Sequence, residues 1–438
     1  MLTPRWTPLR FHPVQQAYWN SPSRFNTVPA GRRSGKTELA KRKLVKRALV
    51  GTEFDPPRFF AGAPTREQAK RIFWDDLKLL IPRHLLKGRP SEVDLMIRLI
   101  NGAQIWVIGL DRPERIEGSP WDGGVLDEYG NMRASAWPEH IRPALSDRGG
   151  WCDFTGVPEG RNHYYDLDRA ARAQMTGLVG DWASFHWISA DILPPDEIAA
   201  ARRDLDDLTY RQEYEASFVS FEGQAYYPFA EGTHCARLKY DPRADLVFCF
   251  DFNVAPEIAA IVQEQMLPNG LSGTGVIGEV HIPRNSSTPA VCRRLIADWG
   301  GHQGRVICHS DSTGGARGSA KVLGSDWDLI RAELSPLFGS RLRLSVPRAN
   351  PPERVRVNAV NARLKSAAGD VRLMVDPVTA PQVQKDFEGV RLLAGGAGEI
   401  DKKVDPGLTH LSDAIGYYIA RQFPLVTREV TAHATEGH

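Results

Sequence analysis

The chain has 438 residues, which is too long for one ordinary hydrophobic core, so two domains are expected. A hydrophobic content of 42%, a charged content of 25% and a formal net charge of +2 are typical of a soluble globular protein and exclude an argument for nucleic-acid binding from overall charge. Five scattered cysteines without a CxxC pair argue against a disulfide framework or a zinc ribbon, and the absence of a long apolar run argues against secretion and membrane spanning.

The first motif is the stretch 30–37, which reads Ala-Gly-Arg-Arg-Ser-Gly-Lys-Thr and fits the Walker A phosphate-binding loop (P-loop). It lies between an expected strand at 24–29 and an expected helix at 38–49, the order that such a loop requires. Lys36 would reach the β- and γ-phosphates of ATP, and Thr37 would hold Mg²⁺. The remaining phosphate contacts would come from the loop backbone, at Gly31, Arg32, Arg33, Ser34 and Gly35. An ordinary glycine-containing turn before a basic helix is the alternative.

Gln15 precedes this loop by about fifteen residues. Its side-chain amide carries both a donor and an acceptor and could contact an adenine edge, whereas a surface glutamine on a short helix is the alternative. Beyond the loop, a strand at 58–64, a helix at 65–74 and a hairpin through Asn101-Gly102 alternate in a way that predicts an α/β sheet.

A short apolar strand at 123–126 ends in Asp127-Glu128, as a Walker B element requires. Asp127 would hold Mg²⁺ through water, and Glu128 would orient or deprotonate the attacking water. An acidic loop is the alternative, but the pairing with the P-loop favours the catalytic interpretation. A further apolar strand ends in Thr155-Gly156, where a polar residue can sense the γ-phosphate and transmit its loss.

Three stretches, 127–130, 156–166 and 210–216, resemble bacteriophage large terminase subunits, the ATP-driven motors that package viral DNA. For this half of the chain the resemblance implies a P-loop ATPase of the additional catalytic glutamate class. The loop departs from the commonest P-loop form by beginning with Ala30 and by carrying two arginines.

Arg32 or Arg33 could stabilise the charge that develops on the γ-phosphate. An arginine finger from a neighbouring subunit is the rival, with Arg112 or Arg115 as candidates. The sequence does not separate these two origins.

The second half begins after a predicted linker at 226–244, which divides an ATPase domain at 1–225 from a domain at 245–425, with a disordered tail at 426–438. Three expected strands, a helix and a fourth strand follow the linker. Asp251 ends the first strand and Asp311 ends the fourth, which is the order of an RNase H-like nuclease. In that fold the two strands are neighbours, so both acids would share two Mg²⁺ or Mn²⁺ ions that activate water for phosphodiester cleavage.

Asp413 supplies the third acid, in a stretch, 410–418, that again resembles the terminase nuclease pattern. Asp405 is an open candidate, because one helix over both acids would separate them by about 12 Å, unless the helix starts later, for example with Thr409 as its cap. Glu279 is a weaker candidate, because a strand glutamate usually faces solvent. Nearby arginines, Arg354, Arg356 and Arg363 among them, predict either a solvated face or a phosphate-tracking surface.

The resemblance covers about residues 10–422 and implies a large terminase subunit that translocates double-stranded DNA into a capsid and cuts concatemers. It also implies a small terminase subunit and a portal protein as partners, a ring of subunits during packaging with a monomer in solution left open, and a place in the host cytoplasm at the portal vertex. A cellular helicase-nuclease and a nucleotide-regulated DNA-binding scaffold without turnover are the alternatives. The sequence does not decide between cos and headful packaging or between nuclease metals.

Overall fold

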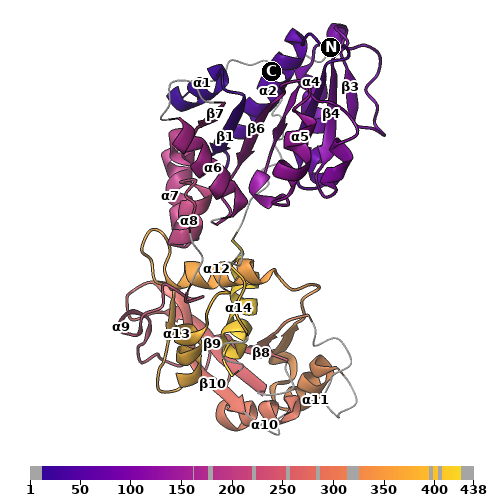
Figure 1. Cartoon of the computed structure of the whole chain (residues 1–438). Coiled ribbons are helices and arrows are strands. Elements are labelled where there is room, and N and C mark those ends of the chain that lie inside the picture. Colours follow the sequence, from indigo (N-terminus) through magenta and orange to yellow (C-terminus); the bar gives the residue numbers. More distant parts are fainter. Residues whose placement is uncertain are drawn as a thin grey trace, which may run out of the picture. The chain divides into compact units, whose positions relative to one another are not determined.

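The computed structural model describes residues 12–160, 162–175, 181–219, 223–252, 257–282, 287–312, 325–393, 398–402 and 407–425. The chain divides into two units (Figure 1). The first comprises Met1–Ile198 and Tyr210–Ser220, and the second comprises Ala199–Thr209 and Phe221–His438. None of the helices in the described part of the chain is long and apolar enough to cross a bilayer.

The first unit is built on a seven-stranded sheet with the order β3-β4-β2-β5-β6-β1-β7. All neighbouring strands are parallel except β3 and β4. The strands β1, β5 and β6 are buried along their whole length, because helices cover both faces of a parallel sheet. The strand bounds are β1 Phe25–Pro29, β2 Arg58–Ala63, β3 Met96–Arg98, β4 Gln104–Gly109, β5 Gly123–Leu126, β6 Trp151–Gly156 and β7 Trp182–Ser184.

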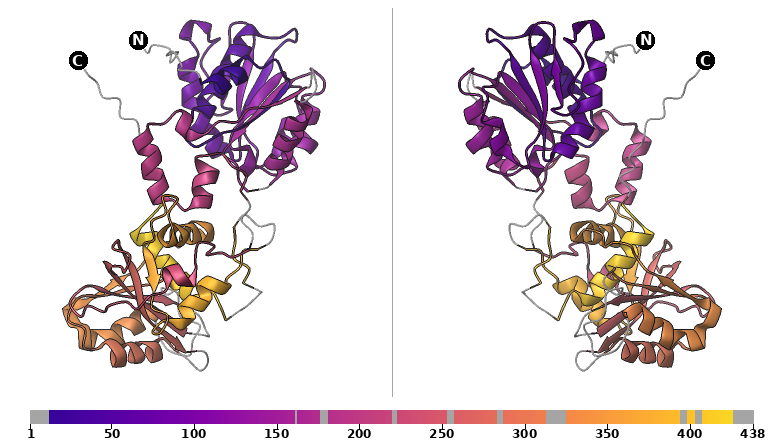
Figure 2. Two further views of the ribbon diagram at one scale, coloured as in Figure 1. Left: turned by 90° about the vertical axis from the view of Figure 1, so that its left-hand side faces the viewer. Right: turned by 90° about the vertical axis from the view of Figure 1, so that its right-hand side faces the viewer.

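Two hydrophobic clusters lie on the two faces of this sheet, and the alternation of β2 separates them. Phe59 packs with α2 and α4, whereas Phe60 packs with Trp137 and Phe154 on the opposite face. Figure 2 shows helices on both sides of the sheet. The helices are α1 Pro13–Asn20, α2 Lys36–Val50, α3 Arg66–Ala69, α4 Asp75–Leu80, α5 Arg142–Ala144 and α6 His163–Gln174, with short 3₁₀ or π segments at Lys70–Trp74, Arg83–Leu85, Pro113–Ile116, Tyr129–Asn131, Ala136–Ile141 and Ser189–Asp191. Two further helices, α7 Pro195–Asp204 and α8 Asp207–Glu213, have residues in both units.

The second unit is built on a six-stranded sheet with the order β12-β11-β8-β9-β10-β13. Only β9 is antiparallel to its neighbours. The predicted first and fourth strands, β8 and β11, are adjacent and parallel. The strand bounds are β8 Leu246–Asp251, β9 Glu257–Met266, β10 Ser272–Ile282, β11 Val306–His309, β12 Leu342–Ser345 and β13 Leu373–Val375.

Helices also cover both faces of the second sheet. Residues of α12, α13 and α14 pack on one face, and residues of α10 and α11 pack on the other. The helices are α9 Glu231–His234, α10 Thr288–Trp299, α11 Asp326–Phe338, α12 Glu353–Leu364, α13 Pro381–Gly389 and α14 His410–Gln422, with a 3₁₀ turn at Gly339–Arg341. The α/β organisation expected from the sequence is therefore present in both units.

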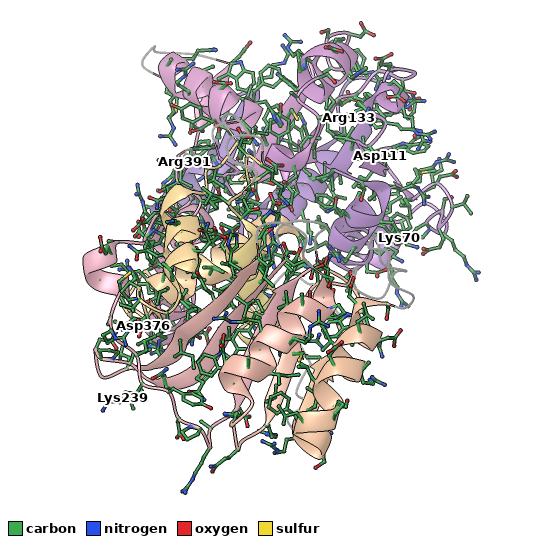
Figure 3. All side chains as sticks on the ribbon, turned by 90° about the horizontal axis from the view of Figure 1, so that it is seen from below. Lys70, Asp111, Arg133, Lys239, Asp376 and Arg391 are labelled. Atoms are coloured by element: carbon green, nitrogen blue, oxygen red, sulfur yellow. The ribbon has the colours of Figure 1, made fainter. Side chains whose placement is uncertain are left out.

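The segment 226–244, predicted to be a linker, lies inside the second unit. Tyr226 and Phe229 are buried in its core, so the composition of this stretch gave the wrong boundary. Asp376, labelled in Figure 3, follows β13 and accepts hydrogen bonds from Arg237 Nη1 at 2.8 Å and from the Leu238 backbone at 3.0 Å. The predicted tail at 426–438 lies outside the described residues.

Candidate nucleotide-binding and metal-binding sites

The predicted P-loop connects β1 to α2, which begins at Lys36. Gly35 caps the helix in the left-handed conformation, with φ at +82°, which favours glycine. A Cβ atom at Gly31 would lie 2.4 Å from Ser189 Oγ and 2.6 Å from the Tyr214 carbonyl oxygen, so glycine is required there as well. Strand, loop and helix thus follow in the predicted order, and phosphate binding by the loop stays a prediction.

Buried side chains brace the loop from behind. Gln15 Nε2 donates to the Ser34 carbonyl oxygen at 2.8 Å, and Trp187 Nε1 donates to Ser34 Oγ at 2.9 Å. Lys36 Nζ is folded onto the Gly31 carbonyl oxygen at 3.4 Å. Because Gln15 is buried, the alternative of a surface glutamine is wrong. Its contact with an adenine edge stays a prediction.

Three predicted side chains meet at the carboxyl end of the first sheet. Asp127 follows β5 and is only 2% exposed. Its Oδ2 accepts a hydrogen bond from Thr37 Oγ1 at 2.9 Å, and its Oδ1 accepts one from Thr155 Oγ1 at 2.6 Å. The loop hydroxyl, the Walker B carboxylate and the proposed γ-phosphate sensor are therefore linked directly. Hydroxyl and carboxylate oxygens are ligands that Mg²⁺ prefers, so these residues fit the ion that accompanies ATP.

Glu128 stands next to this cluster with a left-handed backbone, at φ +54°. Burial raises the pKa of its carboxyl group to about 7, and the negative charge of Asp127 adds to this shift, while Lys36 and Arg32 oppose it. A carboxylate with a pKa near neutrality is suited to act as a general base. Strained backbone of this kind is concentrated at functional sites, at a cost of about 1–3 kcal/mol.

Arg32 is tied to Glu213 at the end of α8. Its backbone N–H donates to the Glu213 carbonyl oxygen at 2.6 Å, and its Nε donates to Glu213 Oε2 at 2.5 Å. Burial lowers the pKa of Arg32, but the carboxylate of Glu213 outweighs burial and raises it. Arg33 has a left-handed backbone and an exposed side chain. Sequence reasoning missed Glu213 as a partner of the loop, since 181 residues separate it from Arg32.

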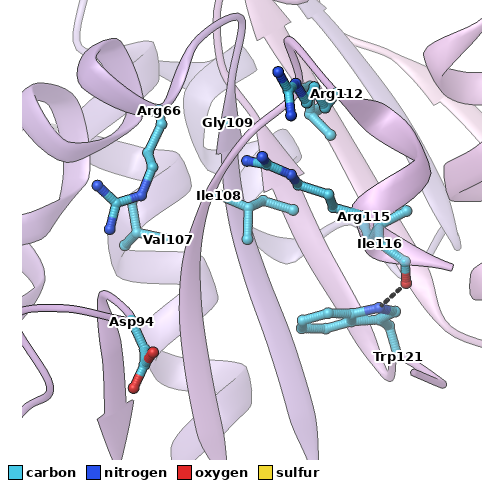
Figure 4. Close-up of a pocket in the computed structure, with 10 residues that line it drawn as sticks. Arg66, Asp94, Val107, Ile108, Gly109, Arg112, Arg115, Ile116 and Trp121 are labelled. Carbon is cyan, nitrogen blue, oxygen red and sulfur yellow. Dashed lines mark hydrogen bonds between the residues drawn. The ribbon is translucent and has the colours of Figure 1, made fainter. Parts of the chain in front are cut away.

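Arg112 and Arg115, the rival arginine-finger candidates, follow β4 and line a cavity of about 160 Å³ (Figure 4). Arg66 and Asp94 contribute to the same cavity. In the sheet, β2, β5 and β6 lie between β4 and β1. Four strand spacings, about 19 Å, therefore separate β4, which precedes both arginines, from β1, which precedes the P-loop.

In the second unit, Asp251 and Asp311 are brought to one edge of the sheet. The register pairs His309 with Cys249, an offset of 309 − 249 = 60, and the same offset places Asp311 opposite Asp251. Cys249 packs in the core cluster that α12, α13 and α14 share, and Asp251 is two residues further along the strand, so both acids lie on the face that α14 covers. His410 Nδ1, at the start of α14, lies 3.2 Å from Asp251 Oδ2.

Asp413 lies on α14 and is buried. Arg356 Nη2 donates to its Oδ1 at 2.7 Å, and Lys402 Nζ lies 3.8 Å from its Oδ2. Burial raises the pKa of Asp413 to about 6; Arg356 opposes the rise and Asp251 adds to it. Burial raises the pKa of Tyr417 to about 12, and Asp251, Asp413 and Asp311 all add to this shift, so the three carboxylates lie within electrostatic reach of one side chain.

The three acids have the oxygen chemistry of a Mg²⁺ or Mn²⁺ site, but they are not gathered as one. Within the described ranges, no three His, Cys, Asp or Glu side chains are placed closely enough to hold a metal ion. Asp413 is turned towards Arg356. The sequence predicts that Arg356 belongs to a solvated or phosphate-tracking surface, but its side chain is buried. The pair Asp251 and Asp311 fits the predicted site, and Asp413 fits it only after it leaves its present partner.

The remaining candidates have separate outcomes. Asp405 lies outside the described residues. Helix α14 begins at His410 with Thr409 as its N-cap residue, which is the late start that Asp405 would need. Glu279 accepts hydrogen bonds from the Gln382 and Val383 backbones at 3.0 and 2.9 Å, and so caps α13 rather than joining the acids.

Comparison with known proteins gives one consistent group. No protein-family model matches the sequence. The chain is 27% identical over 247 residues to a large terminase subunit of Thermus phage G20c, and the alignment covers 49% of this chain and 50% of the relative. A large terminase subunit of Escherichia phage T5 is 27% identical over 221 residues, with 49% of each chain covered. The chain thus spans about half the length of the curated relatives it matches.

Similarity of fold extends further than similarity of sequence. The large terminase of a thermophilic bacteriophage has a TM-score of 0.59 at 16% identity, and the match covers 94% of this chain and 99% of that one. The same terminase in complex with ADP gives 0.58 at 15% identity, with the same coverage. The resemblance to phage large terminase subunits is confirmed, and the two α/β units of the predicted fold are present.

Proposed function

We propose that the chain is a large terminase subunit that hydrolyses ATP to move double-stranded DNA into a capsid and cuts concatemeric DNA with a metal-dependent endonuclease. The observation that carries the ATPase is the direct linkage of Thr37, Asp127 and Thr155 next to Lys36. The large terminase of the thermophilic bacteriophage, which is similar in fold, forms a complex with ADP, and this supports a nucleotide at the P-loop.

At the ATPase site, Mg²⁺ supplies charge neutralisation for the phosphates. Lys36 leaves the Gly31 carbonyl oxygen to contact the β- and γ-phosphates, and the backbone of the loop from Gly31 to Gly35 faces them. Thr37 and Asp127 would hold the ion. Glu128 takes a proton from the attacking water, and Thr155 responds to the γ-phosphate through its bond to Asp127.

The arginine that stabilises the transferred phosphoryl group comes from one of two places. Arg32 reaches its own γ-phosphate only after it breaks its bond to Glu213. Arg112 and Arg115, which follow β4 and not the P-loop strand β1, would act on a neighbouring subunit in a ring. Arg33 is exposed beside the loop and is a further candidate within the same chain.

Asp251 and Asp311, which follow adjacent strands, would hold two divalent ions, and Asp413 would join them from α14. Such ions would supply an activated water and charge neutralisation at the leaving oxygen. His410 lies against Asp251 and orients its carboxylate. The proposed partners are double-stranded DNA, a small terminase subunit and a portal protein, in a ring of subunits in the host cytoplasm.

Glu128→Gln tests the ATPase. The amide keeps the size of the side chain but cannot accept a proton, so ATP should bind while turnover falls by about 100-fold or more. Fluorescent-nucleotide binding and phosphate release measure the two steps. Lys36→Ala is the control, because it should lose binding itself. Unchanged turnover in Glu128→Gln would remove the Walker B assignment.

Asp251→Ala tests the nuclease. Loss of this carboxylate should abolish Mg²⁺- or Mn²⁺-dependent cleavage of plasmid DNA and leave ATP turnover intact, because the two activities use different residues. Glu279→Gln is the matched control in the same unit, since Glu279 caps α13 and should be dispensable for cleavage. Cleavage retained in Asp251→Ala would refute the site.

A further inference from the structure

Arg356 of α12 holds the third acid of the proposed nuclease site. Its Nη2 donates to Asp413 Oδ1 at 2.7 Å, and the two side chains are only 4% and 6% exposed. Lys402 Nζ lies 3.8 Å from the other oxygen of Asp413. Both oxygens of this carboxylate therefore face cationic side chains of the chain itself.

Helix α14 is shaped to receive Arg356. A Cβ atom at Gly416 would lie 2.8 Å from Arg356 Cγ and 3.0 Å from its Cδ, so only glycine leaves room for this side chain across the helix. The ring centroid of Tyr417 lies 4.3 Å from the guanidinium carbon, a cation–π contact on the same helix. Glycine destabilises a helix interior relative to alanine, so Gly416 makes α14 less stable at the position that Arg356 contacts.

Asp413 is the main partner of Arg356. Within the part of the chain that the structure describes, the Arg356 Nε is buried without a hydrogen-bond partner, and Glu353 Oε2 is 3.9 Å from Nη2. An arginine that fixes the orientation of a carboxylate commonly makes two parallel hydrogen bonds to it. Arg356 makes one such bond to Asp413, which is the geometry of a counter-ion that can be exchanged.

The neighbouring charges explain why a counter-ion is present. Asp251 and Asp311 follow β8 and β11 on the face of the sheet that α14, the helix of Asp413, covers, and all three carboxylates act on Tyr417. Like charges buried together require compensation by cations. In the chain alone, Arg356 and Lys402 supply that compensation at Asp413.

We infer that Arg356 is an internal counter-ion that occupies Asp413 until a divalent metal ion replaces it. The inference rests on the proposed nuclease function and adds a competition to it: the metal ion has to take Asp413 from Arg356. Arg356 is thus a positioning residue that weakens metal binding and keeps the site folded before the ion arrives.

Mn²⁺ titration of the full chain, followed by the electron paramagnetic resonance signal of free Mn²⁺, tests this competition. Arg356→Met removes the charge but keeps a long side chain, and should bind Mn²⁺ about tenfold more tightly than the wild type. Arg356→Lys keeps the charge and should stay within about threefold of the wild type. In an Asp413→Asn background, Arg356→Met should have no effect, because the contested ligand is gone.

Unchanged or weaker Mn²⁺ binding in a folded Arg356→Met variant would overturn the inference. If Arg356→Met does not fold, Lys402→Met replaces it, since Lys402 is 58% exposed and lies 3.8 Å from the same carboxylate. The Mn²⁺ affinity of Lys402→Met should rise by about twofold to threefold. An unchanged affinity would equally overturn the inference. The proposed nuclease site fails separately, if the wild type binds no Mn²⁺ or if Asp251→Asn binds it equally well.

Discussion

The carboxyl group of Glu128 is surrounded by opposing charges, and its protonation depends on their balance. Burial and Asp127 raise its pKa to about 7, whereas Lys36 and Arg32 lower it. A general base works only when deprotonated, so the balance of these neighbours sets the pH range of the proposed ATPase.

ATP turnover should therefore fall as the pH drops through about 7, since the protonated Glu128 cannot accept a proton from water. Arg32→Ala removes one of the cations that oppose protonation, and should move this acid limb to higher pH. The measurement is kcat between about pH 5.5 and pH 9 for both proteins.

Arg33→Ala is the control for this pH profile, because Arg33 is not among the groups that shift the pKa of Glu128 most strongly. It should leave the midpoint of the acid limb in place, whatever it does to the rate. If the acid limb stays at the same pH in Arg32→Ala, the group whose protonation reduces turnover is not Glu128.

Gly31→Ala should disrupt the P-loop although it adds a single methyl group. The new carbon would meet Ser189 Oγ, the Ser189 backbone nitrogen and the Tyr214 carbonyl oxygen at 2.4–2.6 Å, and two of these atoms are backbone and cannot rotate away. We expect nucleotide affinity to fall by about tenfold or more, measured by titration with a fluorescent ATP analogue.

Gly130→Ala is the matched control for Gly31→Ala, since the nearest atom to its Cβ would be Glu159 Cβ at 3.4 Å, an ordinary contact. It should bind nucleotide as the wild type does. Normal binding in Gly31→Ala would show that the Ser189 and Tyr214 segments move freely away from the loop.

At the scale of elements, the sequence correctly predicts the position of a residue where that position depends on neighbours in sequence or on one strand pair. Lys36, Thr37 and Asp127 follow strands whose apolar character is plain, and a parallel sheet brings the carboxyl ends of its strands to one edge. The adjacency of β8 and β11 follows from strand order in the same way.

Sequence reasoning failed where a partner comes from a distant segment. Arg32 meets Glu213, and Asp413 meets Arg356, across 181 and 57 residues. The local sequence of α12 contains several arginines, and nothing in it distinguishes Arg356 as the one with a buried side chain. The start of α14 is a further case, because its N-terminus is fixed by Asp386 of α13, which accepts hydrogen bonds from the Leu411 and Ser412 backbones at 3.0 Å each.

Asp386 makes the stability of the second unit depend on pH. Burial raises its pKa from 3.8 to about 7, although the two backbone N–H groups oppose the shift. The stability that its protonated form contributes is fully present below about pH 4 and is lost as the pH rises through about 7. Asp386→Asn stays neutral, so at pH 8 its free energy of unfolding should be about 2–4 kcal/mol higher than that of the wild type.

Urea unfolding at about pH 3.5 and pH 8 measures this difference, which should be small at the lower pH. Glu388→Gln, an exposed carboxyl on the same helix, is the control and should show no such dependence. If Asp386→Asn is less stable than the wild type at the higher pH, the ionised carboxylate is the better cap of α14 and the sign of the linkage is reversed.

At the scale of the whole chain, the second unit includes a short segment that lies, in sequence, between two stretches of the first unit. Ala199–Thr209 belongs to the second unit, although the chain then returns to the first with Tyr210–Ser220. The helices α7 and α8 therefore each begin in one unit and end in the other. Composition predicts a single boundary near residue 225. It cannot predict the two earlier crossings, because the composition of a stretch does not determine which of the two hydrophobic cores it packs against.

The segment 199–209 is attached to the second unit by several polar contacts. Asp206 is buried and accepts a hydrogen bond from Tyr227 OH at 2.5 Å, and the same hydroxyl accepts one from the Leu208 backbone at 3.0 Å. The Ala367 and Ala368 backbones donate to the Leu205 and Arg202 carbonyl oxygens at 2.7 and 2.9 Å. These contacts predict that the second unit needs a segment from before its apparent start.

A fragment of residues 199–438 should therefore be more stable than one of residues 221–438. Loss of three to four hydrogen bonds, at about 1 kcal/mol each, corresponds to a fall of about 10 °C in the melting temperature of a domain of this size. Calorimetry of both fragments measures the difference. Asp206→Ala in the longer fragment is the control that isolates the segment's own contacts, and should lower its melting temperature part of the way towards that of the shorter one. Equal melting temperatures for the two fragments would show that the segment only lies against the second unit and does not stabilise it.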